Sequence, residues 1–208
     1  MNKNIIKQWF SDKGWTFFPF QKRAWEEIHL GKSGLISVPT GAGKTYAAYL
    51  PALSQLHETP GKGIQILYIT PLKALSNDIE KTLKEPILEL NLPYKVEKRT
   101  GDTSAAHKIR QKKSPPEILL TTPESLSLML TQEDAAKRFE NLQMIIVDEW
   151  HELLGTKRGV LLELCLSRIK KESVQIWALT ATIGNLQEAA HVCVGKDRSP
   201  TLITAEMK

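Results

Sequence analysis

A glycine-rich stretch that ends in lysine and threonine is the strongest chemical signal in this sequence. It runs from Ser37 to Thr45 and reads SVPTGAGKT. Glycines let backbone N–H groups curl around phosphate oxygens, and the start of a following helix adds its positive dipole end. Lys44 would reach the β- and γ-phosphates of ATP, and the Thr45 hydroxyl would bind Mg²⁺. Val38 stands where the usual GxxxxGK[ST] pattern has its first glycine. The residues that we assign to the nucleotide here are Thr40, Gly41, Ala42, Gly43, Lys44 and Thr45.

Two adjacent carboxylates form the second signal, at the end of an apolar run. The run is residues 144–147, and Asp148 and Glu149 follow it directly. At the carboxyl edge of a parallel sheet, both side chains would emerge beside the phosphate-binding loop. Asp148 could hold Mg²⁺ or its waters, and Glu149 could polarise a water for attack on the γ-phosphate. The alternative is an ordinary acidic helix start, which loses weight because both signals occur in one chain.

Short apolar runs alternate with helical stretches along the chain. The expected strands are residues 35–38, 64–70, 118–122, 144–147 and 174–180, with a weaker candidate at 94–99 and the start of another at 202–207. The expected helices are residues 4–13, 21–30, 46–56, 72–90, 124–130 and 160–171. The runs are apolar on both faces, as in buried parallel strands. This alternation predicts an α/β fold with an open parallel sheet and helices on both faces.

Length and composition favour one ordinary globular domain. The chain has 208 residues, of which 41% are apolar and 25% charged, which excludes disordered, collagenous and coiled-coil classes. No apolar run approaches the ~18 residues of a membrane span, and charges occupy the first 13 residues, so we expect a cytoplasmic protein. Cys165 and Cys193 lack metal-site spacing and are expected to be core residues.

The charge balance makes a polyanionic partner plausible. The formal net charge is +5. The densest basic stretch, residues 107–113 (HKIRQKK), is interpreted first as a solvated helix face and second as a phosphate-contacting face.

The order of the motifs resembles that of the superfamily 2 DExH-type nucleic-acid helicases. PTGAGKT, DEWH and the Thr180-Ala-Thr182 triplet occur in that order, and four further stretches fit the same series. These are FPFQ at residues 18–21, TPLKAL at 70–75, RTGDT at 99–103 and TTPESL at 121–126. Five stretches are similar in sequence to one branch of this superfamily, the large-helicase-related, ligase-associated DEXH-box proteins of bacteria. They are FPFQ, RTGDT, TTPESLSLML, VDEWHELLG and KRGV.

The resemblance implies roles on the ATP side. Gln21 matches the adenine-reading glutamine, and a carboxamide can pair with adenine N6 and N7; an ordinary helix-start glutamine is the alternative. Phe18 or Phe20 could stack on the base or pack under the helix. Asp148 carries over as the magnesium ligand and Glu149 as the catalytic base. The resemblance makes Lys44, Glu149 and His151 catalytic, and it makes Thr180 and Thr182 the coupling pair toward the nucleic-acid track.

The resemblance also places nucleic-acid contacts on three loops. The assigned residues are Pro71, Lys73, Arg99, Thr100, Gly101, Thr122, Pro123 and Glu124. Lys73 and Arg99 supply positive charge, and the others offer hydroxyls and backbone N–H groups. Contacts of this kind go to the backbone of single-stranded or tailed duplex DNA and imply little sequence preference. Taken without the resemblance, TPLKAL and TTPESL are simply strand-to-helix turns with N-caps.

The family has two such domains, and only the first is matched. We therefore expect N-terminal helices with the adenine motif at residues 1–31, a RecA-like ATP-binding domain at 32–200, and a connection toward a second RecA-like domain at 201–208. The implied function is that of an ATP-dependent DNA helicase or translocase, with ATP and Mg²⁺, in DNA repair alongside a DNA ligase and a nuclease. The alternatives are a P-loop small-molecule kinase, a non-catalytic ATP-gated nucleic-acid-binding module, and an RNA helicase.

Overall fold

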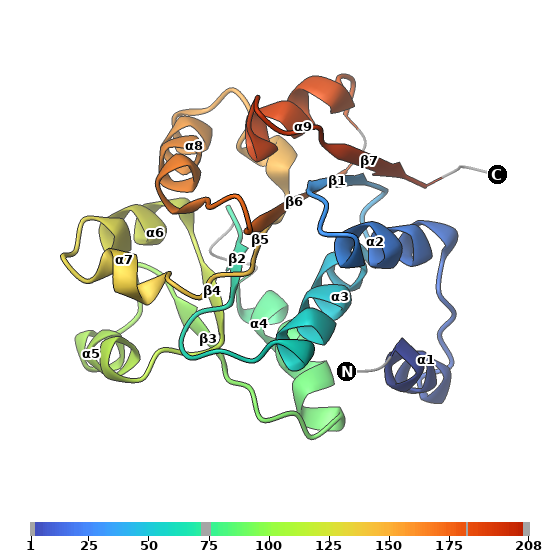
Figure 1. The fold of residues 1–208 in the computed structure, drawn as a ribbon, viewed down its shortest axis with the longest axis horizontal. Coiled ribbons are helices and arrows are strands. Elements are labelled where there is room, and N and C mark those ends of the chain that lie inside the picture. Colours follow the sequence, from blue (N-terminus) through green and yellow to red (C-terminus); the bar gives the residue numbers. More distant parts are fainter. Residues whose placement is uncertain (1–2, 72–75, 182, 206–208) are drawn as a thin grey trace.

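The computed structural model describes residues 3–71, 76–181 and 183–205 (Figure 1). Within these residues seven strands form one sheet in the order β3-β4-β2-β5-β6-β1-β7, and every neighbouring pair is parallel. The strands are β1 (Gly34–Ser37), β2 (Ile66–Ile69), β3 (Val96–Arg99), β4 (Ile118–Thr121), β5 (Met144–Val147), β6 (Gln175–Thr180) and β7 (Thr201–Thr204). The predicted α/β fold with a parallel sheet is thereby confirmed.

Burial explains why the central strands are apolar throughout. All residues of β1, β2, β4, β5 and β6 are buried, because helices cover both faces of a parallel sheet. Strands β3 and β7 form the two edges, and both are only partly buried. Their patterns are correspondingly more polar, and this made them the weaker strand predictions.

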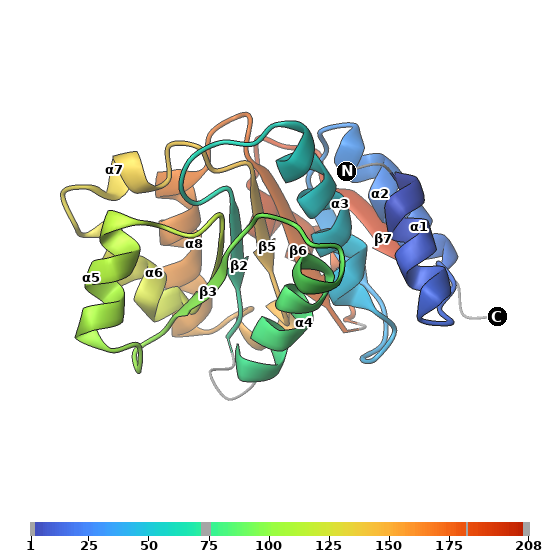
Figure 2. The same cartoon turned by 90° about the horizontal axis from the view of Figure 1, so that it is seen from below.

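Two helical layers enclose the sheet (Figures 1 and 2). The helices are α1 (Lys3–Asp12), α2 (Pro19–His29), α3 (Lys44–Glu58), α4 (Ser76–Glu89), α5 (Ala105–Lys113), α6 (Pro123–Leu130), α7 (Ala135–Arg138), α8 (Lys157–Ile169) and α9 (Leu186–Val194), with a 3₁₀ turn η2 (Trp150–Glu152). Helices α1–α4 share a core with one face of the sheet, and η2 and α6–α9 share a core with the other. Helix α5 lies beside the edge strand, where Gln111 donates to the Lys98 carbonyl at 3.1 Å. In the described part of the chain, no helix is long and apolar enough to span a membrane.

Several expectations are refined by the structure. Helix α9 was not predicted, and residues 72–75 of the predicted helix 72–90 lie outside the described residues. Strand β7 pairs with β1, so residues 201–204 belong to this sheet, and α1 and α2 share the core of α3. Cys165 and Cys193 are buried and unpaired, as expected of core residues.

Candidate functional site

The strand order divides the carboxyl edge of the sheet into two halves. Strands β1, β6 and β5 are neighbours, and they end at the phosphate-binding loop, Thr180 and Asp148. Strands β2, β4 and β3 form the other half, and they lead to Pro71, Thr122 and Thr100. The residues predicted for ATP therefore gather on one half and those predicted for nucleic acid on the other. The halves meet where β5 pairs with β2.

The phosphate-binding loop is a tight turn from β1 into α3. Gly41 and Gly43 have φ angles of 82° and 83°, in the left-handed region that glycine adopts without steric cost. Helix α3 begins at Lys44, so free N–H groups of its first turn face the loop. The Val38 N–H donates to the Thr180 carbonyl at 3.2 Å, which ties the loop to the end of β6. This geometry is suited to cradling phosphate oxygens.

Lys44 and Glu149 face each other inside this turn. The Lys44 side chain is 6% exposed, and its Nζ lies 3.7 Å from Glu149 Oε2. Among the described residues neither atom has a hydrogen-bond partner, although both are buried. A buried charged donor without a hydrogen bond is costly unless a ligand supplies the acceptor. A phosphate oxygen meets that need, so the site fits the polyphosphate of ATP.

Glu149 has an unusual backbone that aims its side chain. Its φ is 45°, which is uncommon for a residue other than glycine and typical of functional sites. Oε2 also lies 3.5 Å from His151 Nδ1, and that nitrogen is 3.2 Å from Thr180 Oγ1. The structure thus brings together Lys44, Glu149, His151 and Thr180. Thr182, the second predicted coupling residue, lies outside the described residues.

Asp148 is buried and held on both oxygens. Oδ1 accepts the Glu149 N–H at 2.9 Å, and Oδ2 accepts the Tyr68 hydroxyl at 2.7 Å. Burial raises the pKa of Asp148, against the opposing effect of the Tyr68 hydrogen bond. The described residues contain no group of three His, Cys, Asp or Glu side chains that could hold a metal ion. A site with one carboxylate suits Mg²⁺, which usually takes one or two carboxylates plus substrate phosphates. Asp148 and Thr45 would hold it.

A pocket of about 530 Å³ lies beside the phosphate-binding loop, and four of its ten lining residues are aromatic. It is lined by Phe10, Gly14, Trp15, Thr16, Phe18, Gln21, Gly41, Ala42, Gly43 and Tyr46. The Gln21 amide accepts the Phe18 N–H at 3.0 Å and donates to the Gly43 carbonyl at 3.2 Å. Gln21 therefore caps its helix, as the simpler interpretation held, and also touches the loop. The amide nitrogen still has one N–H, and the amide oxygen one lone pair, to form hydrogen bonds with the edge of a purine base. Phe20 is buried in the core, so only Phe18 of the two lines the pocket.

The three loops of the other half have different surfaces. Pro71 and Thr100 are buried, whereas Gly101 is exposed. Thr122 caps α6 by accepting the Ser125 N–H at 3.4 Å, and Pro123 follows it at the first helical position. Lys73 lies outside the described residues.

Arg99 is not a surface cation in this structure. Its side chain is buried, and Nη1 donates to the Lys108 carbonyl at 3.5 Å. Burial also lowers the pKa of the guanidinium. The assignment of Arg99 to the nucleic-acid track stays a prediction, and in this structure the side chain lies buried against α5. Lys108 of α5 reaches this loop: its Nζ donates to the Gly101 carbonyl at 3.3 Å.

Glu124 is paired with Arg158, a residue of the KRGV stretch to which the sequence assigned no role. Arg158 donates to both carboxylate oxygens, from Nε at 2.5 Å and from Nη2 at 3.1 Å. This pair joins the start of α6 to the start of α8. It also neutralises a carboxylate that would otherwise repel phosphate.

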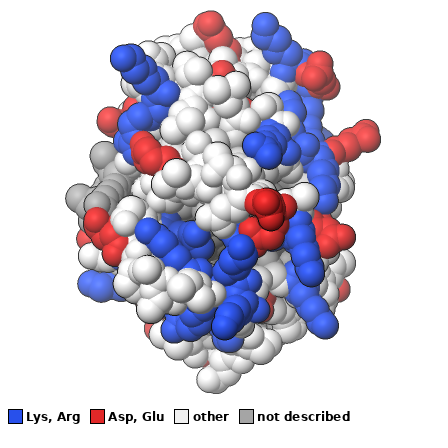
Figure 3. Space-filling model, turned by 90° about the vertical axis from the view of Figure 1, so that its left-hand side faces the viewer, with Lys and Arg blue, Asp and Glu red and all other residues white. Residues whose placement is uncertain are grey.

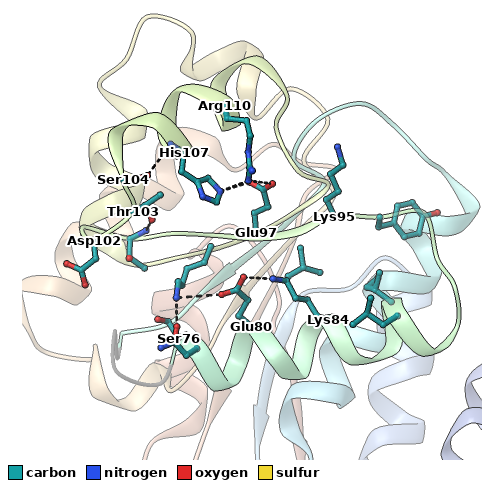
Figure 4. A pocket seen from close by; sticks show the side chains of 17 residues that line it. Ser76, Glu80, Lys84, Lys95, Glu97, Asp102, Thr103, Ser104, His107 and Arg110 are labelled. Atoms are coloured by element: carbon teal, nitrogen blue, oxygen red, sulfur yellow. Dashed lines mark hydrogen bonds and ion pairs between the residues drawn. The ribbon is translucent and has the colours of Figure 1, made fainter.

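A groove of about 650 Å³ runs between α4 and α5 along the edge strand β3 (Figure 4). Two groups of ion pairs line it: Glu80 contacts Lys84 one turn along α4 and Lys98 on β3, and Glu97 on β3 contacts His107 and Arg110 on α5. Lys and Arg side chains gather on the side of the molecule that carries α5, with acidic side chains between them (Figure 3). Much of the basic stretch 107–113 is thus engaged in local ion pairs, which favours the solvated helix face.

Comparison with known proteins identifies the family. Residues 18–189 match the DEAD/DEAH box helicase family, and this range contains the phosphate-binding loop, the acidic pair and the three loops. The chain belongs to this helicase family. The predicted resemblance to a superfamily 2 DExH helicase, first RecA-like domain, is confirmed.

Lhr-type helicases are among its relatives. The chain is 40% identical to the ATP-dependent helicase Lhr-Core of Methanocaldococcus jannaschii, over 98% of the chain and 26% of that protein. It is 36% identical to the Lhr helicase/uracil glycosylase of Escherichia coli, over 88% of the chain and 13% of that protein. The chain thus spans about a quarter or less of the length of these relatives.

Solved helicase structures share the fold. The structure of Mycobacterium smegmatis helicase Lhr bound to ssDNA and AMP-PNP superposes with a TM-score of 0.85 at 36% identity, over 95% of this chain and 27% of that one. The DUF1998 helicase MrfA gives a TM-score of 0.85 at 26% identity, over 99% of this chain and 33% of that one.

Proposed function

We propose that this chain is the ATP-binding half of a motor that moves along a DNA strand and unwinds duplex. The observation that carries the proposal is the pair of Lys44 and Glu149, a buried cation without a hydrogen bond, opposite a carboxylate at 3.7 Å. In this arrangement the lysine is available to bind phosphate oxygens, and the carboxylate is available to bind a water. Bound nucleotide would separate the two charges and satisfy both.

The chemistry that we propose is hydrolysis of the terminal phosphoanhydride. Glu149 orients a water and accepts its proton as the water oxygen bonds to the γ-phosphorus. The bond from that phosphorus to the bridging oxygen breaks, and ADP keeps the bridging electrons. Lys44 stabilises the charge on the phosphate oxygens. Mg²⁺, held by Asp148 and Thr45, would offset further phosphate charge.

The nucleic-acid half of the edge supports a sequence-independent track. The exposed Gly101 backbone and Lys108 of the adjacent helix α5 are suited to phosphate rather than to base edges. The Mycobacterium smegmatis relative is described as bound to ssDNA. We extend that ligand to this chain, and choose DNA over RNA on this ground. A second RecA-like domain would close over the nucleotide and supply arginine fingers.

The cellular setting is part of the same proposal. The similarity of the motif sequences to those of the ligase-associated branch supports a role in DNA repair with a DNA ligase and a nuclease. Co-purification of the protein with these enzymes from its source cells would support that role. Purification without either of them would count against it.

Nucleotide binding by the 208-residue chain tests the proposal. Titration of a fluorescent ATP analogue with Mg²⁺ should give saturable binding that Lys44→Ala weakens by 10-fold or more, as expected for loss of a charge-assisted bond worth about 1.5–3 kcal/mol. Lys196→Ala, a change at an exposed lysine outside the site, is the matched control and should bind like wild type. Equal binding by all three proteins would contradict the proposal.

A further inference from the structure

One buried tyrosine touches the magnesium carboxylate from a neighbouring strand. Tyr68 lies on β2 and is fully buried, and its hydroxyl donates to Asp148 Oδ2 at 2.7 Å. Asp148 follows β5, which pairs directly with β2, so the contact bridges two adjacent strands of the sheet. Neither composition nor motif spacing pointed to Tyr68.

The contact fixes the orientation of the Asp148 carboxylate. The Glu149 N–H holds Oδ1 at 2.9 Å, and the Tyr68 hydroxyl holds Oδ2. With both oxygens held, the carboxylate cannot rotate about its terminal bond without breaking a buried hydrogen bond. Each oxygen keeps a second lone pair for a metal ion or its waters. The arrangement is that of a carboxylate set in advance for a ligand.

The hydroxyl supplies a donor that the buried carboxylate needs. Asp148 is only 6% exposed, and its Oδ2 accepts the Tyr68 hydroxyl at 2.7 Å. A phenylalanine would fill the same space in the core but would leave Oδ2 buried without its donor. The hydroxyl is therefore the part of Tyr68 that packing does not explain.

Tyr68 stands at the boundary between the two halves of the sheet edge. Its strand continues through Thr70 to Pro71, the start of the TPLKAL loop, which is predicted to contact nucleic acid. The hydrogen bond thus joins a strand of the nucleic-acid half to a residue of the ATP half.

We propose that Tyr68 is a positioning residue that orients Asp148 for Mg²⁺. This inference rests on the proposed Mg²⁺–ATP function. Partners that orient metal ligands typically contribute 10- to 100-fold to metal affinity. In wild type, added Mg²⁺ should tighten nucleotide binding. In Tyr68→Phe, the Mg²⁺ concentration that gives half of this effect should be about 10-fold higher. The affinity for nucleotide in EDTA should change much less, because the hydroxyl contacts the two proposed Mg²⁺ ligands, Asp148 and Thr45.

A second tyrosine provides the matched control. Tyr49 is also fully buried, and its hydroxyl donates to the Leu83 carbonyl at 2.9 Å, away from the carboxylates. Tyr49→Phe removes an equivalent buried hydrogen bond and should leave the Mg²⁺ dependence unchanged. In an Asp148→Ala background, Tyr68→Phe should shift the Mg²⁺ dependence much less than it does in the wild-type background, where the hydroxyl holds Asp148.

The outcomes separate this inference from the proposed function. If wild type shows no Mg²⁺-dependent nucleotide binding, the proposed function fails. If wild type binds as expected but Tyr68→Phe has the wild-type Mg²⁺ dependence, the positioning role is overturned. It is overturned equally if Tyr49→Phe shifts the Mg²⁺ dependence as much, or if Tyr68→Phe shifts it as much in the Asp148→Ala background as in the wild-type background. Thermal denaturation of each variant verifies that it is folded under the conditions of the binding experiment.

Discussion

Lys44 Nζ and Glu149 Oε2 lie 3.7 Å apart, yet substitutions of the two residues should affect different steps, nucleotide binding and hydrolysis. Lys44 holds phosphate charge in the ground state, whereas Glu149 acts on the attacking water. In a form of the protein that includes the second RecA-like domain, Lys44→Ala should weaken nucleotide binding. Glu149→Gln should bind nearly normally and lose turnover, by 10²-fold or more if general-base catalysis is removed. Nucleotide titration and phosphate release distinguish the two. Near-wild-type turnover in Glu149→Gln would contradict its role and favour the non-catalytic binding module.

Substitutions of Arg99 and Lys73 should affect single-strand binding differently. Lys73→Ala should lower the log–log salt slope of single-strand binding by roughly 0.7, the value for one lost phosphate contact. Arg99→Ala should leave that slope unchanged, because its guanidinium is buried against the Lys108 carbonyl. Fluorescence anisotropy across a salt series measures both. A fall in slope for Arg99→Ala would show that the arginine reaches the strand after all.

Motif spacing was enough to find the residues that must stand in a fixed local order. Lys44 and Thr45 follow their glycines, and Asp148 and Glu149 end their strand, so the sequence alone could point to them. Tyr68 was missed and Arg158 was given no role, because their contacts cross from one strand or helix to another. Such contacts depend on sheet order and side-chain direction, and no short motif records either.

At the scale of elements, the start of α8 is packed against the turn that carries the acidic pair. A Cβ on Gly159 would lie 2.1 Å from the Leu153 carbonyl oxygen, and backbone cannot yield cheaply. Gly159→Ala should therefore destabilise the fold by about 1–3 kcal/mol, as other overpacking changes do. Gly101→Ala is the control: nothing lies within 4 Å of its Cβ position, and its φ is not positive. It should change stability by less than about 0.5 kcal/mol. Urea denaturation compares them, and equal midpoints would refute this account of Gly159.

The buried elements were predictable and the peripheral ones less so. Strand β5 was predicted at its observed bounds because four apolar residues must be buried on both faces. Helix α9 was missed although Asn185 caps it by accepting the Glu188 N–H at 3.2 Å, a signal that the sequence did contain. The placement of β7 beside β1 could not be predicted, since a short strand at the chain end can pair at either edge.

At the scale of the whole molecule, the sheet and both helical layers form a continuous unit with a core on each face. The ATP motifs open onto one edge of that unit. A second RecA-like domain would cover this edge and complete the charge stabilisation of the transferring phosphoryl group, worth about 10³–10⁵ in rate for an arginine finger. The 208-residue chain should fold and bind nucleotide, and it should hydrolyse it very slowly.

Phosphate release by these 208 residues, with and without single-stranded DNA, tests the central claim most directly. The claim is that the chain is one half of a two-domain motor. It predicts Mg²⁺-dependent nucleotide binding, hydrolysis close to background, and no acceleration by DNA, because stimulation works through closure of two domains. DNA-stimulated turnover by the chain alone at roughly 1 s⁻¹ or more, in the range of ordinary enzymes, would contradict it.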